Sequence, residues 1–193
     1  MMPTLFPFWP PHPPGFSYIE EFLSMQEEIH LIEAVRSVTV HPMIFQGYQA
    51  KRKVQSFGYD YHFDTRKLIP GTPIPNAFQS LIDKVAKHLS LPPEDFAELL
   101  VTEYPQGSVI NWHRDAPPFD IIAGISLLQD CNFRFRPHDK SKQGRKSILT
   151  FPVKRRSLYI LQQESRNDWE HSISPVKGTR YSITLRTLKK ASG

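Results

Sequence analysis

Seven short segments rich in β-branched and aromatic residues fill the second half of the chain: ELLVTEY (98–104), SVINWHRD (108–115), IIAGISLL (121–128), NFRFRP (132–137), SILTFPV (147–153), RSLYILQQ (156–163) and RYSITLRTL (180–188). Turn residues separate them, and no helical pattern of apolar residues lies between them. Consecutive strands without intervening helices pair mostly antiparallel, so the segments predict a sheet sandwich or barrel. A doubly wound parallel sheet is disfavoured.

Upstream of these segments, apolar residues recur at the three- and four-residue spacing of amphipathic helices. The spacing covers residues 18–38 and again residues 77–91, where a proline-rich stretch precedes it and would start the helix. Between the two, the aromatic stretch 46–64 indicates a strand pair or a hinged loop. We therefore expect an α+β, mostly β fold with the N-terminal helices packed on one sheet.

The length of 193 residues predicts a single domain, and 24 Lys and Arg against 19 Asp and Glu give a formal net charge of +5. This charge favours an anionic partner without identifying it. The single cysteine, Cys131, excludes an intrachain disulfide and a multi-cysteine zinc site. No stretch is apolar enough to cross a bilayer, so we expect no membrane partner. Because one cysteine demands no oxidising compartment, we expect a cytoplasmic protein, and we expect a monomer. Residues 1–16, interrupted by prolines, are expected to form an extended arm.

The segment NWHRD (111–115) places His113 and Asp115 two residues apart, so that both side chains share one face of a strand. One imidazole and one carboxylate can chelate a cation, and His171 in DWEHSISP is available as a third ligand. Two histidines and one carboxylate form the facial triad of non-haem Fe(II) sites, which leaves coordination positions open. The alternative is that these residues are solvated at the surface.

Alternation in RYSITLR (180–186) places Arg180 and Arg186 on one face of a strand, with Ser182 and Thr184 between them. If the opposite, apolar face packs against the helices, the arginines point into the sandwich. Buried guanidinium groups need anionic partners, and a dicarboxylate held at a metal would supply one. The alternative is a solvated edge strand.

Together, His-x-Asp, a distant His and an Arg-x5-Arg strand directly after it resemble the AlkB family of Fe(II)- and 2-oxoglutarate-dependent dioxygenases. The resemblance runs from about residue 47 to residue 188 and includes, in the family's order, FGYDYHF, EYPQGSVINWHRD, ISLL, SRNDWEHSISP and RYSITLR. It implies a double-stranded β-helix (jelly-roll) fold with its core at residues 94–190 and a nucleotide-recognition lid at residues 40–75. It also implies Fe(II) and 2-oxoglutarate as cofactors.

Positions that match the family's motifs acquire roles from this resemblance. The implied iron ligands and 2-oxoglutarate contacts are His113, Asp115 and His171 for iron, and Tyr104, Arg180 and Arg186 for the co-substrate. The chain departs from the family at Thr102 and Ser182, where asparagine is usual, so hydroxyls replace amides in the expected co-substrate site. It departs again at Pro117, where many members have an acidic residue that reads the base. Asp120 is the nearby candidate for that role.

Substrate contacts are expected in the aromatic stretch before the second helix. Phe57, Tyr59 and Tyr61 alternate there and would share one face of a strand that stacks on a base. Three cations precede them and would contact a nucleic-acid backbone: Lys51, Arg52 and Lys53. The alternative is that the three aromatic side chains simply form one packed face.

A stronger charge signal lies between residues 134 and 156, where nine Lys and Arg accompany one acid, Asp139. The release of counterions makes such a cluster favourable for binding phosphates. We expect the loop in this stretch to bind a nucleic-acid backbone through four side chains: Lys140, Lys142, Arg145 and Lys146.

The function implied by the resemblance is oxidative removal of N-alkyl groups, as in 1-methyladenine or 3-methylcytosine, from DNA or RNA. Succinate, CO₂ and formaldehyde would be released. Alkylated bases inside a helix are inaccessible, so such an enzyme acts on single strands or flips the base out. Two alternatives stay open, namely the same chemistry on tRNA or protein and a non-catalytic nucleic-acid-binding module. The paired arginines argue against the module, because a structural metal needs no dicarboxylate.

Overall fold

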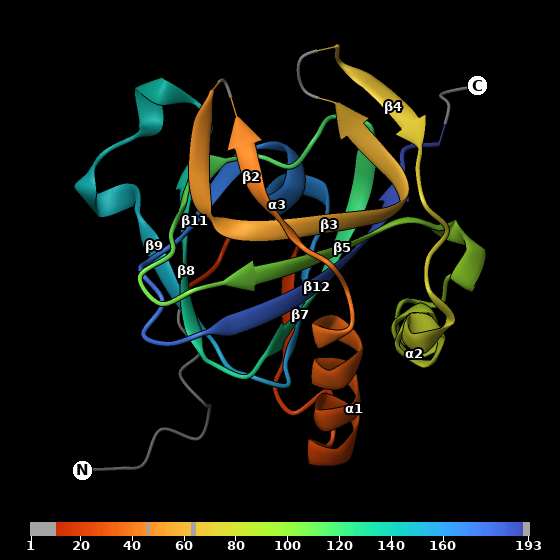
Figure 1. Cartoon of the computed structure of the whole chain (residues 1–193). Helices are drawn as coiled ribbons and strands as arrows, with labels where there is room; N and C mark the ends of the chain where they lie inside the picture. Colours follow the sequence, from red (N-terminus) through yellow and green to blue (C-terminus); the bar gives the residue numbers. More distant parts are fainter. Residues whose placement is uncertain (1–10, 46, 63–64, 191–193) are drawn as a thin grey trace.

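The computed structural model describes residues 11–45, 47–62 and 65–190, and within them the chain forms two sheets (Figure 1). The strands of the larger sheet are β1 (Phe16–Ile19), β2 (His41–Phe45), β3 (Tyr48–His62), β4 (Lys67–Pro70), β5 (Phe96–Tyr104), β7 (Phe119–Leu127), β10 (Leu158–Leu161) and β12 (Arg180–Leu188). Those of the smaller sheet are β6 (Ile110–His113), β8 (Cys131–Pro137), β9 (Leu149–Val153) and β11 (Trp169–Ile173).

The larger sheet has the order β1-β10-β7-β12-β5-β3-β2, with β4 paired to β3, and the smaller sheet has the order β6-β11-β8-β9. From β5 onward the chain passes back and forth between the two sheets, and the pairing within both is antiparallel. This is the jelly-roll arrangement of two facing sheets. The predicted mostly β fold is therefore confirmed.

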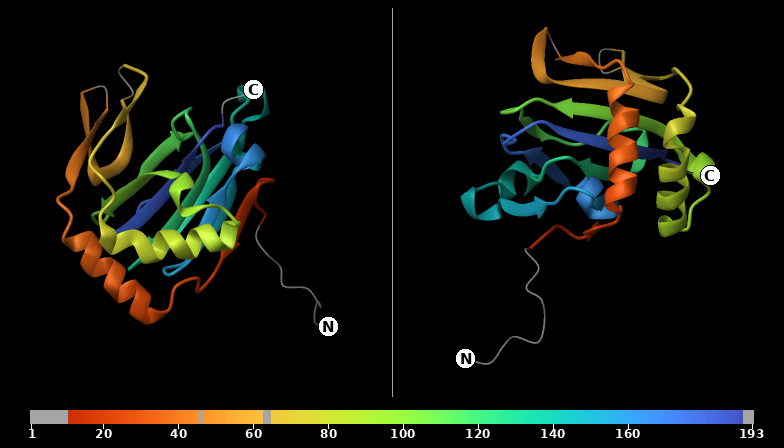
Figure 2. Two further views of the ribbon diagram at one scale, coloured as in Figure 1. Left: turned by 90° about the vertical axis from the view of Figure 1, so that its right-hand side faces the viewer. Right: turned by 60° about the horizontal axis from the view of Figure 1, so that its bottom comes forward.

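Two helices, α1 (Met25–Arg36) and α2 (Gln79–Leu89), lie across the outer face of the larger sheet (Figure 2). Their apolar sides pack on that sheet in one core, and a second core fills the space between the sheets. The remaining helical segments are α3 (Gln163–Asn167) and the 3-10 turns Asn76–Phe78, Pro93–Asp95, Lys140–Lys142 and Arg145–Ser147. Within the described residues, no helix is long and apolar enough to span a membrane.

The first helix begins later than its apolar spacing predicts. The Ser24 hydroxyl accepts a hydrogen bond from the Glu27 backbone N–H, and the Glu27 carboxylate accepts one from Ser24 in return, which closes a capping box. Ahead of this cap the chain is extended, and β1 adds to the edge of the larger sheet beside β10. The end of the expected arm is thus a strand, while residues 1–10 of that arm lie outside the described residues.

Part of the segment expected as a lid, residues 40–75, belongs to the larger sheet. β3 pairs with β5 from Lys53 to Gly58 and then with β4 from Tyr59 onward. Gly58 makes the change of direction possible, because its φ is +81° and an added Cβ would lie 2.2 Å from the carbonyl oxygen of Ala97. Side chains before and after Gly58 therefore do not follow a single alternating pattern of faces.

Candidate active site

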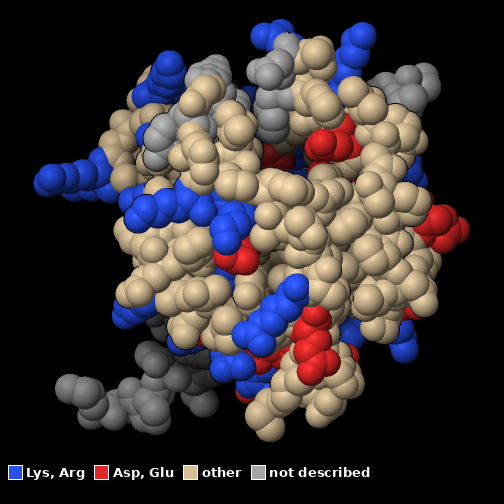
Figure 3. Space-filling view, viewed as in Figure 1, with Lys and Arg blue, Asp and Glu red and all other residues tan. Residues whose placement is uncertain are grey.

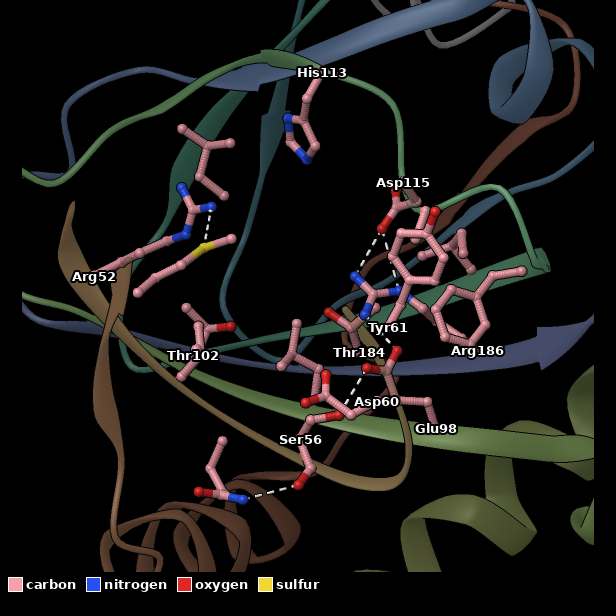
Figure 4. Close-up of a pocket in the computed structure, with 18 of the residues that line it drawn as sticks. Arg52, Ser56, Asp60, Tyr61, Glu98, Thr102, His113, Asp115, Thr184 and Arg186 are labelled. Atoms are coloured by element: carbon pink, nitrogen blue, oxygen red, sulfur yellow. Dashed lines mark hydrogen bonds and ion pairs between the residues drawn. The ribbon is translucent and has the colours of Figure 1, made fainter. Parts of the chain in front are cut away.

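A cavity of about 490 Å³ lies between the two sheets and the β2–β3 segment. Its lining comes from both sheets, and Figure 4 shows the polar side chains that point into it. The polar and charged lining residues that concern the chemistry are Arg52, Ser56, Asp60, Tyr61, Glu98, Thr102, Tyr104, His113, Asp115, His171, Thr184 and Arg186. The cavity volume falls within the range of about 300–1,000 Å³ that is typical of small-molecule sites.

The structure brings the three predicted metal ligands together at this cavity. His113 ends β6 and pairs in register with His171 on β11, and their ring centroids are 4.3 Å apart. The Nε2 atom of His171 lies 3.6 Å from Oδ2 of Asp115. One ligand atom from each of the three residues fits within 4.8 Å of the others. Two imidazoles and one carboxylate at this separation suit a single Fe(II) held on one face.

The protonation states at the site favour metal binding. Burial, together with the nearby charge of His113, lowers the pKa of His171 to about 3. Burial also lowers the pKa of His113, whose Nδ1 lies 2.9 Å from the carbonyl oxygen of Asn111. A proton on this Nδ1 would be donated to that carbonyl, which leaves Nε2 free for a metal. Burial acts to raise the pKa of Asp115, but the Arg186 charge outweighs it and the pKa is lowered. Neutral imidazoles and an ionised carboxylate are the forms that bind metal.

Arg186 has partners that differ from the expected co-substrate. Its Nε and one terminal nitrogen donate to Oδ1 of Asp115, at 3.1 and 2.7 Å. The other terminal nitrogen pairs with Glu98, whose carboxylate also accepts a hydrogen bond from Ser56. Arg186 therefore orients a metal ligand and neutralises Glu98. The prediction that it binds a 2-oxoglutarate carboxylate is not supported by this geometry, because both carboxylates that it needs are supplied by the chain.

Arg180, unlike Arg186, forms no ion pair with a described carboxylate of the chain. It is fully buried, its Nε donates to the Ser126 hydroxyl at 3.0 Å, and its guanidinium lies 4.8 Å from the ring centroid of Tyr104. Among the described residues, its two terminal nitrogens have no acceptor of strict hydrogen-bonding geometry, and neither does the Ser182 hydroxyl, although the Tyr104 side chain lies close enough to help raise the pKa of Arg180. Such buried donors are costly unless an anion meets them. A distal carboxylate of 2-oxoglutarate fits these orphaned donors.

The two positions where hydroxyls replace asparagines face each other in the sheet. Ser182 pairs in register with Thr102, and Arg180 pairs with Tyr104. Thr102 and Tyr104 both line the cavity. The four residues therefore stand together on adjacent strands, although Arg180 and Ser182 are not among the residues that line the cavity.

The expected aromatic clamp is divided by the bend at Gly58. Phe57 is buried in the core between the larger sheet and the helices, near Phe78, so it cannot stack on a substrate and its predicted role is wrong. Tyr59 is 37% exposed and does not line the cavity. Only Tyr61 of the three lines it.

The acidic group expected at Asp120 is also absent from the cavity lining, and Asp60 stands in the lining instead. Sequence reasoning missed Asp60 and Glu98. An acid within an aromatic strand next to Gly58 was the available signal for Asp60. Nothing in the local sequence of Glu98 distinguishes it from a solvated residue.

The three cations of residues 51–53 do not point in one direction, because successive side chains of a strand face opposite sides of the sheet. Lys51 is exposed, and Lys53 pairs with Glu103 at 2.9 Å on the outer side. Arg52 points the other way and lines the cavity (Figure 4). We expected Arg52 to contact a nucleic-acid backbone from the protein surface. This prediction is wrong, because the side chain lies inside the cavity.

The basic stretch 134–156 does not form one continuous patch. Three of its cations pair with acids at the β9–β10 turn, where Lys154 meets Asp130, Arg155 meets Glu28 and Arg156 meets Glu21. Two others, Arg134 and Arg136, lie against the ring of Trp112.

The β8–β9 connection keeps the remaining cations of this stretch exposed. Lys142 lies 3.7 Å from Asp139, whereas Lys140, Arg145 and Lys146 have no acidic partner in the described part of the chain. Figure 3 shows Lys and Arg side chains projecting at the left, where this connection lies in Figure 1. Three of the four predicted loop cations are thus free to contact an anion, and Lys142 is exposed but paired with Asp139.

The comparisons with known proteins agree with the site. The family model of the 2OG-Fe(II) oxygenase superfamily matches residues 15–186. A relative from Mus musculus, the tRNA (carboxymethyluridine(34)-5-O)-methyltransferase ALKBH8, is 29% identical over 86% of this chain and 25% of its own length. The uncharacterized protein L905 of Acanthamoeba polyphaga mimivirus is 28% identical over 91% of this chain and 86% of its own. The chain spans about a quarter of the length of the ALKBH8 relatives from mouse, macaque and Xenopus tropicalis.

Two solved structures share the fold. OsALKBH1 superposes with a TM-score of 0.73 at 14% identity, over 91% of this chain and 98% of that one. A prolyl hydroxylase from Trichoplax adhaerens, in complex with a peptide fragment, superposes with a TM-score of 0.63 at 16% identity, over 90% of this chain and 83% of that one. At these identities the likeness concerns the fold.

Proposed function

The chain belongs to the 2OG-Fe(II) oxygenase superfamily, and from this premise we propose that it oxidises a C–H bond on a nucleobase of tRNA. The predicted resemblance to AlkB enzymes is confirmed by the ALKBH8 relatives and the OsALKBH1 fold. The chain is accordingly a dioxygenase that uses Fe(II) and 2-oxoglutarate, and the alternative of a non-catalytic module is wrong. The nucleic-acid substrate is the part that we propose.

The chemistry that iron, O₂ and 2-oxoglutarate supply when bound is hydroxylation of a C–H bond, with succinate and CO₂ as products. His113, Asp115 and His171 would hold the metal, and Arg186 orients Asp115 through two hydrogen bonds. Arg180 would hold the distal carboxylate of the co-substrate from a fully buried position. The remaining task of the chain is to present one C–H bond of the substrate to this site.

The observation that carries the nucleic-acid proposal is the set of exposed cations on the β8–β9 connection. Lys140, Arg145 and Lys146 have no acidic partner among the described residues, unlike the cations of the β9–β10 turn. A protein substrate would not require this arrangement, whereas a phosphate backbone gains affinity from every cation it meets. The cavity would then take a single base that leaves its stack.

The choice of tRNA over alkylated DNA rests on two further points. The ALKBH8 relatives from mouse, macaque and Xenopus tropicalis are methyltransferases of a tRNA uridine, and we carry over the tRNA and not the methyl transfer. In addition, 1-methyladenine and 3-methylcytosine carry positive charge at neutral pH, and Arg52 presents a like charge inside the cavity. Alkylated DNA is therefore the second substrate class in the test.

The test measures succinate formation and base oxidation by mass spectrometry with three substrates: total tRNA, an oligodeoxynucleotide containing 1-methyladenine or 3-methylcytosine, and a proline-containing peptide. The wild-type enzyme and Asp115→Ala are compared with Fe(II), 2-oxoglutarate and ascorbate. We expect oxidation of a tRNA base that is absent in the variant. Stimulation by the methylated DNA alone, or by the peptide alone, would reject the tRNA proposal.

Neutralising the loop should weaken nucleic-acid binding and its dependence on salt. Replacing Lys140, Arg145 and Lys146 together by alanine removes three phosphate contacts, so the slope of log affinity against log salt should decrease by about 2 for a single strand. Fluorescence anisotropy with a labelled RNA at several salt concentrations gives the affinities from which this slope is calculated. The control is a triple alanine variant on the helical layer at Arg36, Lys84 and Lys87, which changes net charge equally. Equal slopes in the two variants would show that the loop is not the contact.

A further inference from the structure

Arg52 is a charged side chain inside the cavity whose partner the chain does not supply. Strand alternation directs Arg52, Val54 and Ser56 of β3 into the cavity, while Lys53 points outward to Glu103. In Figure 4, Arg52 reaches in from one side, and Asp60 and Glu98 lie on the other. Arg52 therefore stands apart from the acidic groups that line the same cavity.

The contacts of Arg52 do not compensate its charge. Its only hydrogen bond in the described part of the chain runs to the sulfur of Met43, which is a weak acceptor, and no described carboxylate lies within ion-pair distance. Burial lowers the pKa of Arg52 from its usual value, as expected for a guanidinium removed from water. By contrast, the buried guanidinium of Arg186 meets two carboxylates. A partly buried cation without an anion is costly, so Arg52 is suited to receive one from a ligand.

Both carboxylates of 2-oxoglutarate already have assigned partners in the site. 2-Oxoglutarate carries two, of which one belongs at the metal and the other fits the orphaned donors of Arg180. A third cationic position at Arg52 therefore has no remaining carboxylate of the co-substrate to bind. The anion that meets it must come from the substrate.

The position of Arg52 also shows where on the substrate this anion lies. Arg52 and His113 line the same cavity, and Figure 4 draws both side chains pointing into it. A group bound there would share the cavity with the three metal-ligand residues. It is not a distant part of the strand held by the loop cations.

We propose that Arg52 binds an oxyanion of the substrate, a carboxylate on the base or the adjoining phosphate, next to the C–H bond that is oxidised. This inference rests on the proposed function and narrows it, since the cavity then selects a base that is neutral or anionic. Asp60, on the opposite wall, is placed to accept hydrogen bonds from the same base.

The test is a double-mutant cycle that compares the binding of RNA with and without each anion to proteins with and without the Arg52 side chain. The probes are labelled RNA 9-mers with a central uridine, with a central 5-carboxymethyluridine, and with a central uridine whose 5′ phosphate is replaced by a neutral methylphosphonate. Binding is measured by anisotropy to the full chain loaded with Mn(II) and 2-oxoglutarate. The proteins are wild type, Arg52→Met, Arg52→Lys and, as a matched control, Arg36→Met on the exposed side of α1.

We expect one of the two anions to strengthen wild-type binding at least 10-fold, and this gain to vanish in Arg52→Met, to persist in part in Arg52→Lys and to be intact in Arg36→Met. The two comparisons identify the source of the oxyanion, carboxylate or phosphate. The affinity for 2-oxoglutarate, measured by calorimetry, should change less than 2-fold in Arg52→Met. A gain that is insensitive to Arg52, or a 10-fold loss of 2-oxoglutarate affinity, overturns the inference.

Failure of this inference and failure of the proposed function are distinguishable. Oxidation of tRNA by the wild-type enzyme, without coupling between Arg52 and either anion, removes the inference alone. Coupling in the binding measurements without oxidation of any nucleic acid removes the proposed function and leaves the role of Arg52 in place.

Discussion

Replacing His171 with alanine is expected to abolish iron binding and, with it, turnover of 2-oxoglutarate. The chain offers three ligands at this site, and removing one leaves a single imidazole and the Asp115 carboxylate. Changes in the outer shell of a metal site already cost about 10–100-fold in affinity or activity. The loss of a ligand should therefore exceed about 100-fold in succinate formation, with iron content near zero after dialysis.

Iron per chain is measured by plasma emission spectrometry and succinate by mass spectrometry on the same preparations. The control is His30→Ala, which removes an exposed imidazole on α1 that contacts only Gln26 among the described residues. Circular dichroism verifies that both variants are folded. Retention of one iron per chain in His171→Ala would show that the metal is held elsewhere.

Replacing the two buried arginines of β12 should give opposite results, although they share one face of one strand. In Arg180→Met, the removed guanidinium has two orphaned terminal nitrogens, so the stability of the free protein should be unchanged or higher. Binding of 2-oxoglutarate should fall by about 30-fold or more, because its distal carboxylate would be buried without a partner. In Arg186→Met, Glu98 and Asp115 are left as uncompensated buried carboxylates, which should cost about 3–5 kcal/mol of stability.

Thermal unfolding with and without 2-oxoglutarate separates the two cases. Arg180→Met should lose the shift in Tm on adding the co-substrate while keeping the Tm of the free protein, whereas Arg186→Met should lower the Tm of the free protein itself. Equal destabilisation of the free protein by both substitutions would contradict the assignment of Arg180 to the co-substrate.

Several parts of the fold were predictable from local pattern. Short β-branched segments separated by turns marked the strands from β5 to β10 and β12, because alternation of apolar residues is imposed by burial of one face. The same alternation placed Tyr181, Ile183 and Leu185 on the face opposite Arg180, and the structure decides between the two alternatives by packing these three residues toward the helices and burying Arg180. Four short strands, β1, β2, β4 and β11, were not recognised, since few residues carry their pattern. The stretch 46–64, expected as a strand pair or hinged loop, contains the single strand β3 in its described part.

The predicted substrate contacts failed where the backbone departs from regular geometry. Alternation predicts one face for Phe57, Tyr59 and Tyr61, but the left-handed Gly58 and the change of pairing from β5 to β4 place Phe57 in the core and Tyr61 at the cavity. Likewise, nine cations in one stretch suggested one patch, and four of them are neutralised by acids from other segments of the chain. Local composition carries no information on such partners.

The amino-acid sequence by itself indicated the mostly β fold and the three candidate metal ligands, and it placed Arg180 and Arg186 on one strand face without deciding whether that face is buried, because strand alternation and ligand chemistry act within short segments. Only the tertiary structure decided what each buried charge meets. Arg186 is neutralised by Asp115 and Glu98, while Arg180 and Arg52 are left for ligands. The reason is physical: the free energy of a buried charge depends on the few ångströms around it, and those neighbours come from strands far apart in the chain.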